Sequence, residues 1–401
     1  MFLFQFGGDW LFNTIWLLLF ILMMFFYPKL LITQMIWKLE QTANMLTGLT
    51  TRAKKTILKK ISKNPSSKLK SMINNFLEFF VIQPVDLDPY GIVKKIEHLS
   101  NLQESRFKYF VKNVAPHFDS ESRANLMMSL SGAISLHQIE KIVRHYVELV
   151  KKTKNFQYGL ILQMQLPMIE RLSKALLKGT EALANGWSLG DSIGALVAAK
   201  LIGNTKTKEI EEDTLIAKKK IKGRTVFIIK AKGPGGRLGK LGKAVEKLVK
   251  RQKIDKIITI DAAAKLEGER TGTVAEGVGV AIGGLGVDRA YIENLATKHN
   301  IPLDSVVIKM SQEEAIMPMR LEILNSVKDV VNTVYDNIMR SKGKIIVVGV
   351  GNTCGIGNDE KSAVEAEKKI KKVALMMKKR EEEEKKKEKK KFDWITSPLG
   401  I

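Results

Sequence analysis

Cysteine is nearly absent from the chain: one residue, Cys354, stands among 401. A lone cysteine excludes an intramolecular disulfide framework and suits a reducing compartment. Histidine is scarce as well, with five residues in all. His137 and His145 stand eight positions apart, not the four that would place two ligands on one helix face, and no cysteine accompanies them. A histidine-based metal site is therefore not predicted.

Acidic residues are the minority charge, with 42 Asp and Glu against 66 Lys and Arg, so the formal net charge is +24. The excess gathers in residues 29–70 and in a tail at residues 378–391. No nucleic-acid recognition fold and no basic strand interleaved with aromatic residues accompanies either block, so nucleic acid is not favoured as a partner. A solvated face or contact with an anionic lipid surface explains the charge better.

Charge is missing altogether from one stretch, Trp10–Tyr27, which reads WLFNTIWLLLFILMMFFY. Together with the apolar residues 2–6 it approaches the ~20 residues that span a bilayer. Aromatic residues mark both ends, Asp9 is the only charge before it, and lysines and arginines follow it. The positive-inside rule then predicts a single-pass membrane protein with its N-terminus outside and its bulk in the cytoplasm. A buried core helix is the alternative, whereas the basic start and cleavage site of a signal peptide are lacking.

The hydrophobic pattern changes along the chain and predicts five parts. Apolar residues recur at helical spacing up to about residue 203, and short β-branched runs alternate with helical stretches after residue 214. The expected fold is α/β: an N-terminal transmembrane helix, a helical middle region and a doubly wound, mainly parallel sheet with helices on both faces. The helical middle could also build a homo-oligomer. The parts are a transmembrane anchor (1–28), a basic juxtamembrane helix (29–66) at the membrane surface or in a stalk, a helical domain (67–185), an α/β domain with glycine-rich acidic loops (186–377) and a charged tail (378–401).

The strongest candidate site lies in Lys256–Val287, where a strand-like run ends on Asp261 and carboxylates follow among glycines. A strand end that presents an acid and opens into flexible backbone is where open α/β sheets place ligands. A second acid, Asp191, lies in the turn Gly190–Gly194, and the resemblance given below implies that it is the partner of Asp261. Two close carboxylates share a proton and can act as acid and base on a water molecule.

Three interpretations of these acids stay open. Asp191, Asp261 and Glu267 form the predicted catalytic set. Alternatively, Asp191, Asp261 and Glu269 hold a divalent cation through carboxylate oxygens. Asp191 could also serve only as the N-cap of the apolar helix that follows it.

Two further glycine-rich loops follow strand-like runs. Backbone N–H groups at a helix start favour anions, so both loops are candidates for holding the phosphate of a cofactor, with a plain tight turn as the alternative. Cys354 in the second loop is a candidate nucleophile at a helix start, where the pKa of a thiol falls. The predicted cofactor-binding residues are Gly233, Gly235, Arg237, Lys240, Gly349, Gly351 and Asn352.

Taken together, these loops resemble the germination protease and hydrogenase maturation protease superfold, which has a phosphorylase/hydrolase-like α/β architecture. Val348–Asn352 resembles its glycine-asparagine strand end, Gly190–Gly194 its acidic glycine turn, and Ile260–Ala262 a later strand end. The resemblance implies a peptidase in which Asp191 and Asp261 are the catalytic pair. It also implies a circular permutation, because the glycine-asparagine strand comes last here.

The whole layout resembles an uncharacterised archaeal membrane-anchored family with a domain of unknown function. The residues that carry this resemblance are Glu267–Gly284, which match EGExTGxVAEGVGxAIGG. That resemblance implies no activity. The predicted function is a membrane-anchored cytoplasmic protein with a carboxylate or divalent-metal site, of a peptidase-like hydrolase kind. The alternative is a non-catalytic phosphate- or nucleotide-binding or scaffold module at the membrane.

Overall fold

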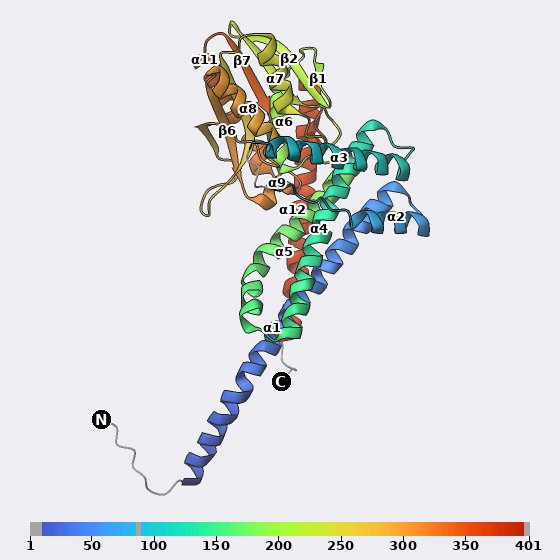
Figure 1. Cartoon of the computed structure of the whole chain (residues 1–401), viewed down its shortest axis with the longest axis vertical. Coiled ribbons are helices and arrows are strands. Elements are labelled where there is room, and N and C mark those ends of the chain that lie inside the picture. The colour runs from blue at the N-terminus through green and yellow to red at the C-terminus, as the bar shows by residue number, and fades with distance from the viewer. Residues whose placement is uncertain (1–9, 86–89, 397–401) are drawn as a thin grey trace, which may run out of the picture. The chain divides into compact units, whose positions relative to one another are not determined.

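The computed structural model describes residues 10–85 and 90–396 (Figure 1). The chain forms two compact units, each built from two separate stretches. The first joins residues 1–51 with 136–173, and the second joins residues 52–135 with 174–401. The predictions about residues 1–9, and about the end of the tail after residue 396, lie outside the described residues. The five domain boundaries expected from the sequence stay a prediction.

In its described residues the first unit consists of parts of three long helices: α1 (Trp10–Ile61), α4 (Ser120–Thr153) and α5 (Phe156–Asn185). Figure 1 shows α4 and α5 as a hairpin beside α1. Hydrogen bonds join Thr42 to Glu170 at 2.9 Å and Thr47 to Glu140 at 2.7 Å. Residues 30–51 of α1 therefore pack against the hairpin as a stalk. The apolar residues buried in this unit are Met35, Leu39, Ala43, Leu46, Leu49, Leu136, Val143, Val147, Val150, Leu162 and Leu166.

In the first half of α1, no other described part of the chain covers the side chains, whereas the second half packs against the hairpin. Among the described residues, α1 is the one helix long and apolar enough to cross a membrane, and none of its most apolar window is buried. Its side chains from Ile15 to Tyr27 are between 40% and 66% exposed. Membrane anchors and signal sequences both contain an apolar N-terminal helix, so the helix alone does not distinguish an anchor from a signal sequence.

The second unit contains a mixed sheet of seven strands within the described residues. The order across the sheet is β1-β2-β3-β7-β4-β6-β5. The four central strands β3, β7, β4 and β6 are parallel, whereas β1, β2 and β5 are antiparallel to their neighbours. The strand bounds are β1 Lys208–Glu211, β2 Thr214–Ile221, β3 Arg224–Ala231, β4 Lys256–Ala264, β5 Val274–Val278, β6 Leu303–Met310 and β7 Lys344–Gly349.

Helices cover both faces of this sheet, as the alternation of strand and helix patterns predicts. One face carries α6 (Ile193–Ile202), α11 (Val327–Arg340) and α12 (Glu360–Thr396), and the other carries α7 (Leu241–Arg251) and α8 (Val287–His299). The α/β fold expected from the sequence is thus confirmed. The remaining elements are α2 Ser67–Leu77, α3 Ile92–Val114, α9 Gln312–Ile316, α10 Leu321–Asn325 and the short 3-10 helix η1 Gly190–Ser192.

The connections after neighbouring central strands leave toward opposite faces. The chain passes from β3 through α7 to β4 on one face, and from β6 through α11 to β7 on the other. After β7 it turns to α12, on the face opposite α7 and α8. The strand order therefore creates crevices beside β7 at the C-terminal edge of the sheet, which is where ligands bind in open α/β sheets.

Two expectations about the strands are wrong. The strand predicted to end on Asp261 continues as β4 to Ala264, because β6 pairs with it as far as Met310. The glycine-rich segment beyond was expected to be a loop, but it contains the edge strand β5, which pairs with β6. Of the two neighbours of β4, β7 ends first: its last residue, Gly349, lies opposite Ile260. Asp261 therefore lies inside a strand, one position beyond the end of its neighbour.

Candidate functional site

Asp191 lies in η1, a single turn that leads directly into α6. Nine of the ten residues of α6 are buried, because the helix contacts the sheet as well as α11 and α12. Gly194 allows the close approach: a Cβ there would lie 2.3 Å from the carbonyl oxygen of Ile260 and 2.4 Å from that of Val350. The start of α6 thus presses on the C-terminal ends of β4 and β7 and carries Asp191 to that edge.

The interpretation of Asp191 as the N-cap of α6 is wrong. Ser192 is the N-cap, and no side chain caps the helix there. The Asn352 amide instead donates to Asp191 Oδ2 at 3.1 Å. Gly351, one residue earlier, has φ +113°, and a Cβ on it would lie 1.9 Å from the Asp191 carbonyl oxygen. Only glycine permits this contact between η1 and the loop after β7.

Asp261 is buried, with 3% of its surface exposed. Its Oδ1 accepts the Ala262 amide at 2.7 Å, and the Gly283 amide donates to the same carboxyl group. The Val350 amide donates to the Ile260 carbonyl at 2.9 Å, and β7 then leaves β4. Asp261 therefore lies where the loop after β7 turns toward η1.

The carboxyl groups of Asp191 and Asp261 interact electrostatically. Burial raises the pKa of Asp261 well above its usual range, and the negative charge of Asp191 raises it further. Burial also raises the pKa of Asp191, which the Asn352 amide opposes. Two such carboxyl groups cannot both ionise cheaply, so the ionisation of one opposes the ionisation of the other. The fold thus brings together two acids that stand seventy positions apart in the sequence.

Asn352 adds a donor without a partner. Its side chain is 2% exposed, and its Oδ1 accepts the Cys354 amide at 2.8 Å, which fixes the orientation of the side-chain amide. Its Nδ2 is buried and has no hydrogen-bond partner. An unsatisfied buried donor costs about 1–3 kcal/mol, so it is retained only with a reason. Asn352 bonds Asp191 through its backbone amide, so the unpaired donor belongs to a residue that directly contacts the acid pair.

Glu267 and Glu269 do not join the pair through any contact found in the described residues. Glu267 is exposed, and Glu269 accepts the Leu266 amide and lies 3.7 Å from the Lys309 ammonium. A different set of carboxylates, Glu104, Glu212 and Asp213, has ligand oxygens within 4.8 Å of one another. That set is neutralised by the chain's own cations, which are Lys108, Lys240 and Arg237.

The loop after β3 has its donors occupied. The backbone amides of Gly233, Gly235 and Gly236 donate to the side chains of Asn358, Glu121 and Asn125. The Arg237 guanidinium, 7% exposed, pairs with Glu121 at 2.6 Å and Asp213 at 3.1 Å. Lys240 pairs with Glu212 at 2.9 Å and Asn101 at 3.0 Å.

The loop after β7 is equally closed around its glycines. A Cβ on Gly349 would lie 2.3 Å from the Ala198 Cβ, and one on Gly233 would lie 1.8 Å from the Ile356 carbonyl oxygen. Cys354 is fully buried, and burial raises the pKa of its thiol to about 12. The expectation of a lowered thiol pKa at this position is therefore wrong, because desolvation outweighs any effect of the helix start.

Sequence reasoning missed Lys230, in β3. It is fully buried, and its ammonium donates to the Ala231 carbonyl at 2.7 Å, the Gly357 carbonyl at 3.1 Å and Asn358 Oδ1 at 3.0 Å. Burial lowers the pKa of Lys230 to about 7. Lys230 thus joins the end of β3 to the residues that precede α12. The sequence feature that could have identified Lys230 is its position directly after the apolar run Val226–Ile229.

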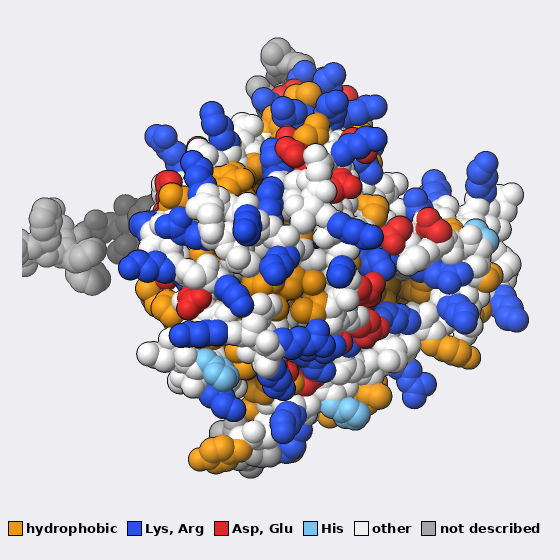
Figure 2. Space-filling model, turned by 90° about the horizontal axis from the view of Figure 1, so that it is seen from above, with side chains coloured by type: hydrophobic (Ala, Val, Ile, Leu, Met, Phe, Trp, Pro, Cys, Tyr) orange, Lys and Arg blue, Asp and Glu red, His pale blue; other side chains and the backbone are white. Residues whose placement is uncertain are grey.

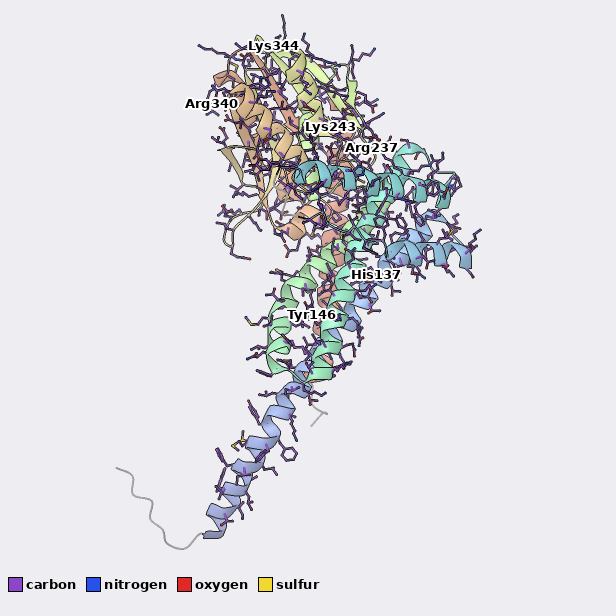
Figure 3. All side chains as sticks on the ribbon, in the orientation of Figure 1. His137, Tyr146, Arg237, Lys243, Arg340 and Lys344 are labelled. Carbon is purple, nitrogen blue, oxygen red and sulfur yellow. The ribbon has the colours of Figure 1, made fainter. Side chains whose placement is uncertain are left out.

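A cavity of about 420 Å³ lies beside the C-terminal edge of the sheet. It lies between α3, α4, the loop after β3 and the loop Gly283–Gly286, and it mixes apolar side chains with both signs of charge. Gly283, which bonds Asp261, is part of its wall. Figure 3 labels Arg237 and Lys243 on this side of the sheet, where Lys243 forms an ion pair with Glu97 of α3. Figure 2 shows one face of the molecule, on which basic side chains are spread with acidic ones between them.

The comparisons with known proteins agree on one family. A model described as the N-terminal domain of a protein of unknown function, DUF1512, matches residues 13–186. The model of the DUF1512 C-terminal domain matches residues 189–357, which includes Asp191, Asp261 and Asn352. No curated protein and no solved structure matches the chain. Because the two models together span most of the sequence, the chain belongs to the DUF1512 family.

Proposed function

We propose that this protein is a membrane-anchored hydrolase that cleaves an acyl bond, such as a peptide bond, with Asp191 and Asp261 as its acid–base pair. The observation that carries the proposal is the position of Asp191 and Asp261 at the C-terminal edge of the sheet, where the loop after β7 bonds Asp191 and Asp261 is buried beside the end of β7. The raised pKa of Asp261, caused by burial and by the charge of Asp191, supports it. Perturbed carboxyl pairs at such an edge are typical of catalytic sites. The resemblance to germination proteases points to the same two residues.

In the proposed reaction Asp191, ionised, takes a proton from a water molecule whose oxygen attacks the carbonyl carbon. Asp261, protonated, gives its proton to the leaving nitrogen as the carbon–nitrogen bond breaks. The proton on Asp191 then returns to Asp261, which restores the pair. The unpartnered Nδ2 of Asn352 is suited to donate to the oxygen that gains negative charge, a role that side-chain amides fill in other hydrolytic sites.

The cavity beside Gly283 supports a substrate with a peptide-like mixture of groups. Its wall includes the apolar Phe107 and Leu285 as well as the charged Glu97 and Lys243. The loop that separates it from Asp261 is rich in glycine, and side chains at Gly283, Gly284 and Gly286 would meet open space. We propose that this loop lifts to admit the substrate, because Asp261 is otherwise sealed from solvent.

The membrane anchor is the second part of the proposal. A soluble core helix would be covered, whereas the apolar window of α1 is not. By the positive-inside rule, the charges on either side of the apolar run support an N-terminus outside and a cytoplasmic location for the chain after the anchor. Archaeal origin, which the resemblance to an archaeal family implies, stays a hypothesis.

The occupied donors of the glycine loops count against the alternative of a phosphate- or nucleotide-binding module. A phosphate would have to displace Glu121, Asn125 and Asn358 from the backbone amides they accept. Arg237 and Lys240 are likewise held by carboxylates. We therefore interpret these glycines as sites of close backbone contact that position the acids.

The test is hydrolysis by the purified full-length protein in lipid nanodiscs. The probes are a mixture of quenched fluorescent peptides with blocked termini and p-nitrophenyl acetate. We expect D191N and D261N each to lower the rate about 10²-fold or more, as the loss of a general acid or base does. E365Q is the matched control, because Glu365 is an exposed acid of α12 outside the proposed site, and its rate should equal that of the wild type.

Equal rates in D191N, D261N and the wild type would contradict the proposal. A divalent cation held by the same carboxylates is distinguished by adding a chelator. Acid–base catalysis by the pair alone predicts no loss of rate, whereas a metal-dependent reaction would stop and recover with added Mg²⁺ or Mn²⁺.

A further inference from the structure

The hairpin formed by α4 and α5 ends in a turn whose side chains are uncovered in the first unit. Phe156, Tyr158 and Ile161 are 43%, 51% and 60% exposed. The same turn carries the exposed lysines Lys152 and Lys154. An apolar and aromatic surface with lysines around it is unusual in contact with water alone.

Contacts with α1 fix the level of this turn along the stalk. Lys151 of α4 pairs with Glu40, and a Cβ on Gly159 of α5 would meet the Met35 side chain. Farther along, Thr42 bonds Glu170 at 2.9 Å. The turn therefore lies beside residues 35–40 of α1, at the end of the hairpin nearer the apolar half of that helix.

Trp37 lies at this same level and is 62% exposed. It stands twenty-seven positions after Trp10 in one continuous helix, which is a distance of about 40 Å. A bilayer with its headgroups is about 40–45 Å thick. Between Tyr27 and Trp37 the only charge is Lys29, whose long side chain can reach the headgroups. Trp37 therefore marks the level at which the helix leaves the headgroup layer.

We propose that the tip belt, defined as Trp37, Lys152, Lys154, Phe156, Tyr158 and Ile161, lies in the headgroup layer of an anionic membrane. This inference rests on the proposed anchoring by α1 and adds a second, peripheral contact. Aromatic rings favour the membrane interface and lysines favour anionic headgroups, so the belt has the chemistry of that layer on both counts. Two contact points would hold the stalk at a fixed tilt and stop it from rotating freely.

The experiment uses the full-length chain in vesicles of phosphatidylcholine with added phosphatidylglycerol. An NBD fluorophore is attached to Y158C or I161C in the tip belt, to L19C in the anchor as a positive control, and to V278C as a control for water. Val278 is 92% exposed in the second unit. The native Cys354 is fully buried and stays unlabelled. Quenchers are lipids with a nitroxide on the headgroup or at the fifth acyl carbon.

We expect the headgroup nitroxide to quench NBD at residues 158 and 161, the acyl nitroxide to quench it at residue 19, and neither to quench it at residue 278. Reversal of the two lysines, K152E/K154E, is expected to weaken quenching at residue 161 only when phosphatidylglycerol is present. The partition of the tip belt into the headgroup layer should fall about fivefold for each lysine charge removed.

Three outcomes would overturn the inference and are distinguishable. Quenching at residue 19 without quenching at 158 and 161 leaves the anchor intact and removes the belt. Absence of quenching at residue 19 contradicts the anchoring itself. If NBD at residue 161 is quenched by other labelled copies, in proportion to the protein density in the vesicle and independently of the nitroxide lipids, a second chain covers the surface.

Discussion

Lys230 and Asp261 are both buried where a charge is costly, and the fold treats them differently. The Lys230 ammonium receives three oxygen acceptors and no carboxylate. Asp261 receives two backbone amides and a like charge nearby. The three acceptors satisfy the ammonium, but burial without a counterion still lowers the pKa of Lys230 to about 7. The surroundings of Asp261 favour its protonated form, because burial and a like charge both raise its pKa.

Stability should depend on pH through Lys230. Its pKa is about 7 in the folded chain and 10.5 ordinarily, so the unfolded chain binds more protons between these values. The free energy of unfolding should then rise from about pH 7 to pH 10.5, by at most about 1.4 kcal/mol per pH unit. K230M should remove this slope and lower stability at neutral pH, because three acceptors lose their donor.

Urea unfolding in detergent across this pH range measures both effects. K218M is the matched control, since Lys218 is exposed on the neighbouring β2. An unchanged slope in K230M would show that Lys230 titrates at its ordinary pKa.

At the scale of elements, glycines decide how closely the loops approach one another. Gly351 and Gly194 stand where a Cβ would collide with backbone oxygens, whereas Gly277 and Gly283 face open space. The first kind holds η1, β4 and β7 together around the acids. The second kind leaves open space around these glycines in the segment beside Asp261, which is expected of a loop that has to move.

Replacement of the two kinds of glycine should have opposite results. G351A places a Cβ 1.9 Å from the Asp191 carbonyl oxygen at φ +113°, so we expect a loss of about 3 kcal/mol or more in the free energy of unfolding. G277A, in the edge strand β5, meets nothing within 4 Å and should change it by less than about 0.5 kcal/mol. Thermal unfolding followed by circular dichroism compares them, and similar losses in both would contradict this account.

The elements differ in how well the sequence reveals them. β3, β4 and β7 are continuous β-branched runs, which local pattern identifies. β2 was not recognised because Lys218–Lys220 interrupt its alternation, and β5 was not recognised because glycine dilutes its strand signal. Motif resemblance predicts the pairing of Asp191 with Asp261. The surroundings of Asn352 and Lys230 are different, because they depend on contacts between residues more than a hundred positions apart. Such contacts leave no periodicity to read.

At the scale of the whole molecule, two units of different character share one chain. The first carries the uncovered apolar helix and the second carries the acid pair. The two family models match residues 13–186 and 189–357, so the match covers residues of both units. The proposed function uses both, because an anchor confines a hydrolase to substrates at the membrane surface.

Anchoring should be lost when charge enters the middle of the apolar run. Leu18 and Ile21 are 60% and 40% exposed, and a lysine at the centre of a spanning helix costs about 2.5–3.5 kcal/mol. We expect the full-length protein to stay in the membrane pellet after an alkaline carbonate wash, and L18K/I21K to be released. L30K, beyond the run, should stay in the pellet. Recovery of the unmodified chain in the soluble fraction would contradict the anchor.

The strand order has a consequence for synthesis on the ribosome. β3 and β4 do not pair with each other, since β7 lies between them and is the last strand of the sheet to be made. The long-range pairing that joins the two sides of the sheet must wait for it. Asn352, which bonds Asp191, follows only three residues after β7 ends. A nascent chain therefore carries both aspartates for nearly a hundred residues without a formed site, and the proposed activity would begin only after Asn352 has been added.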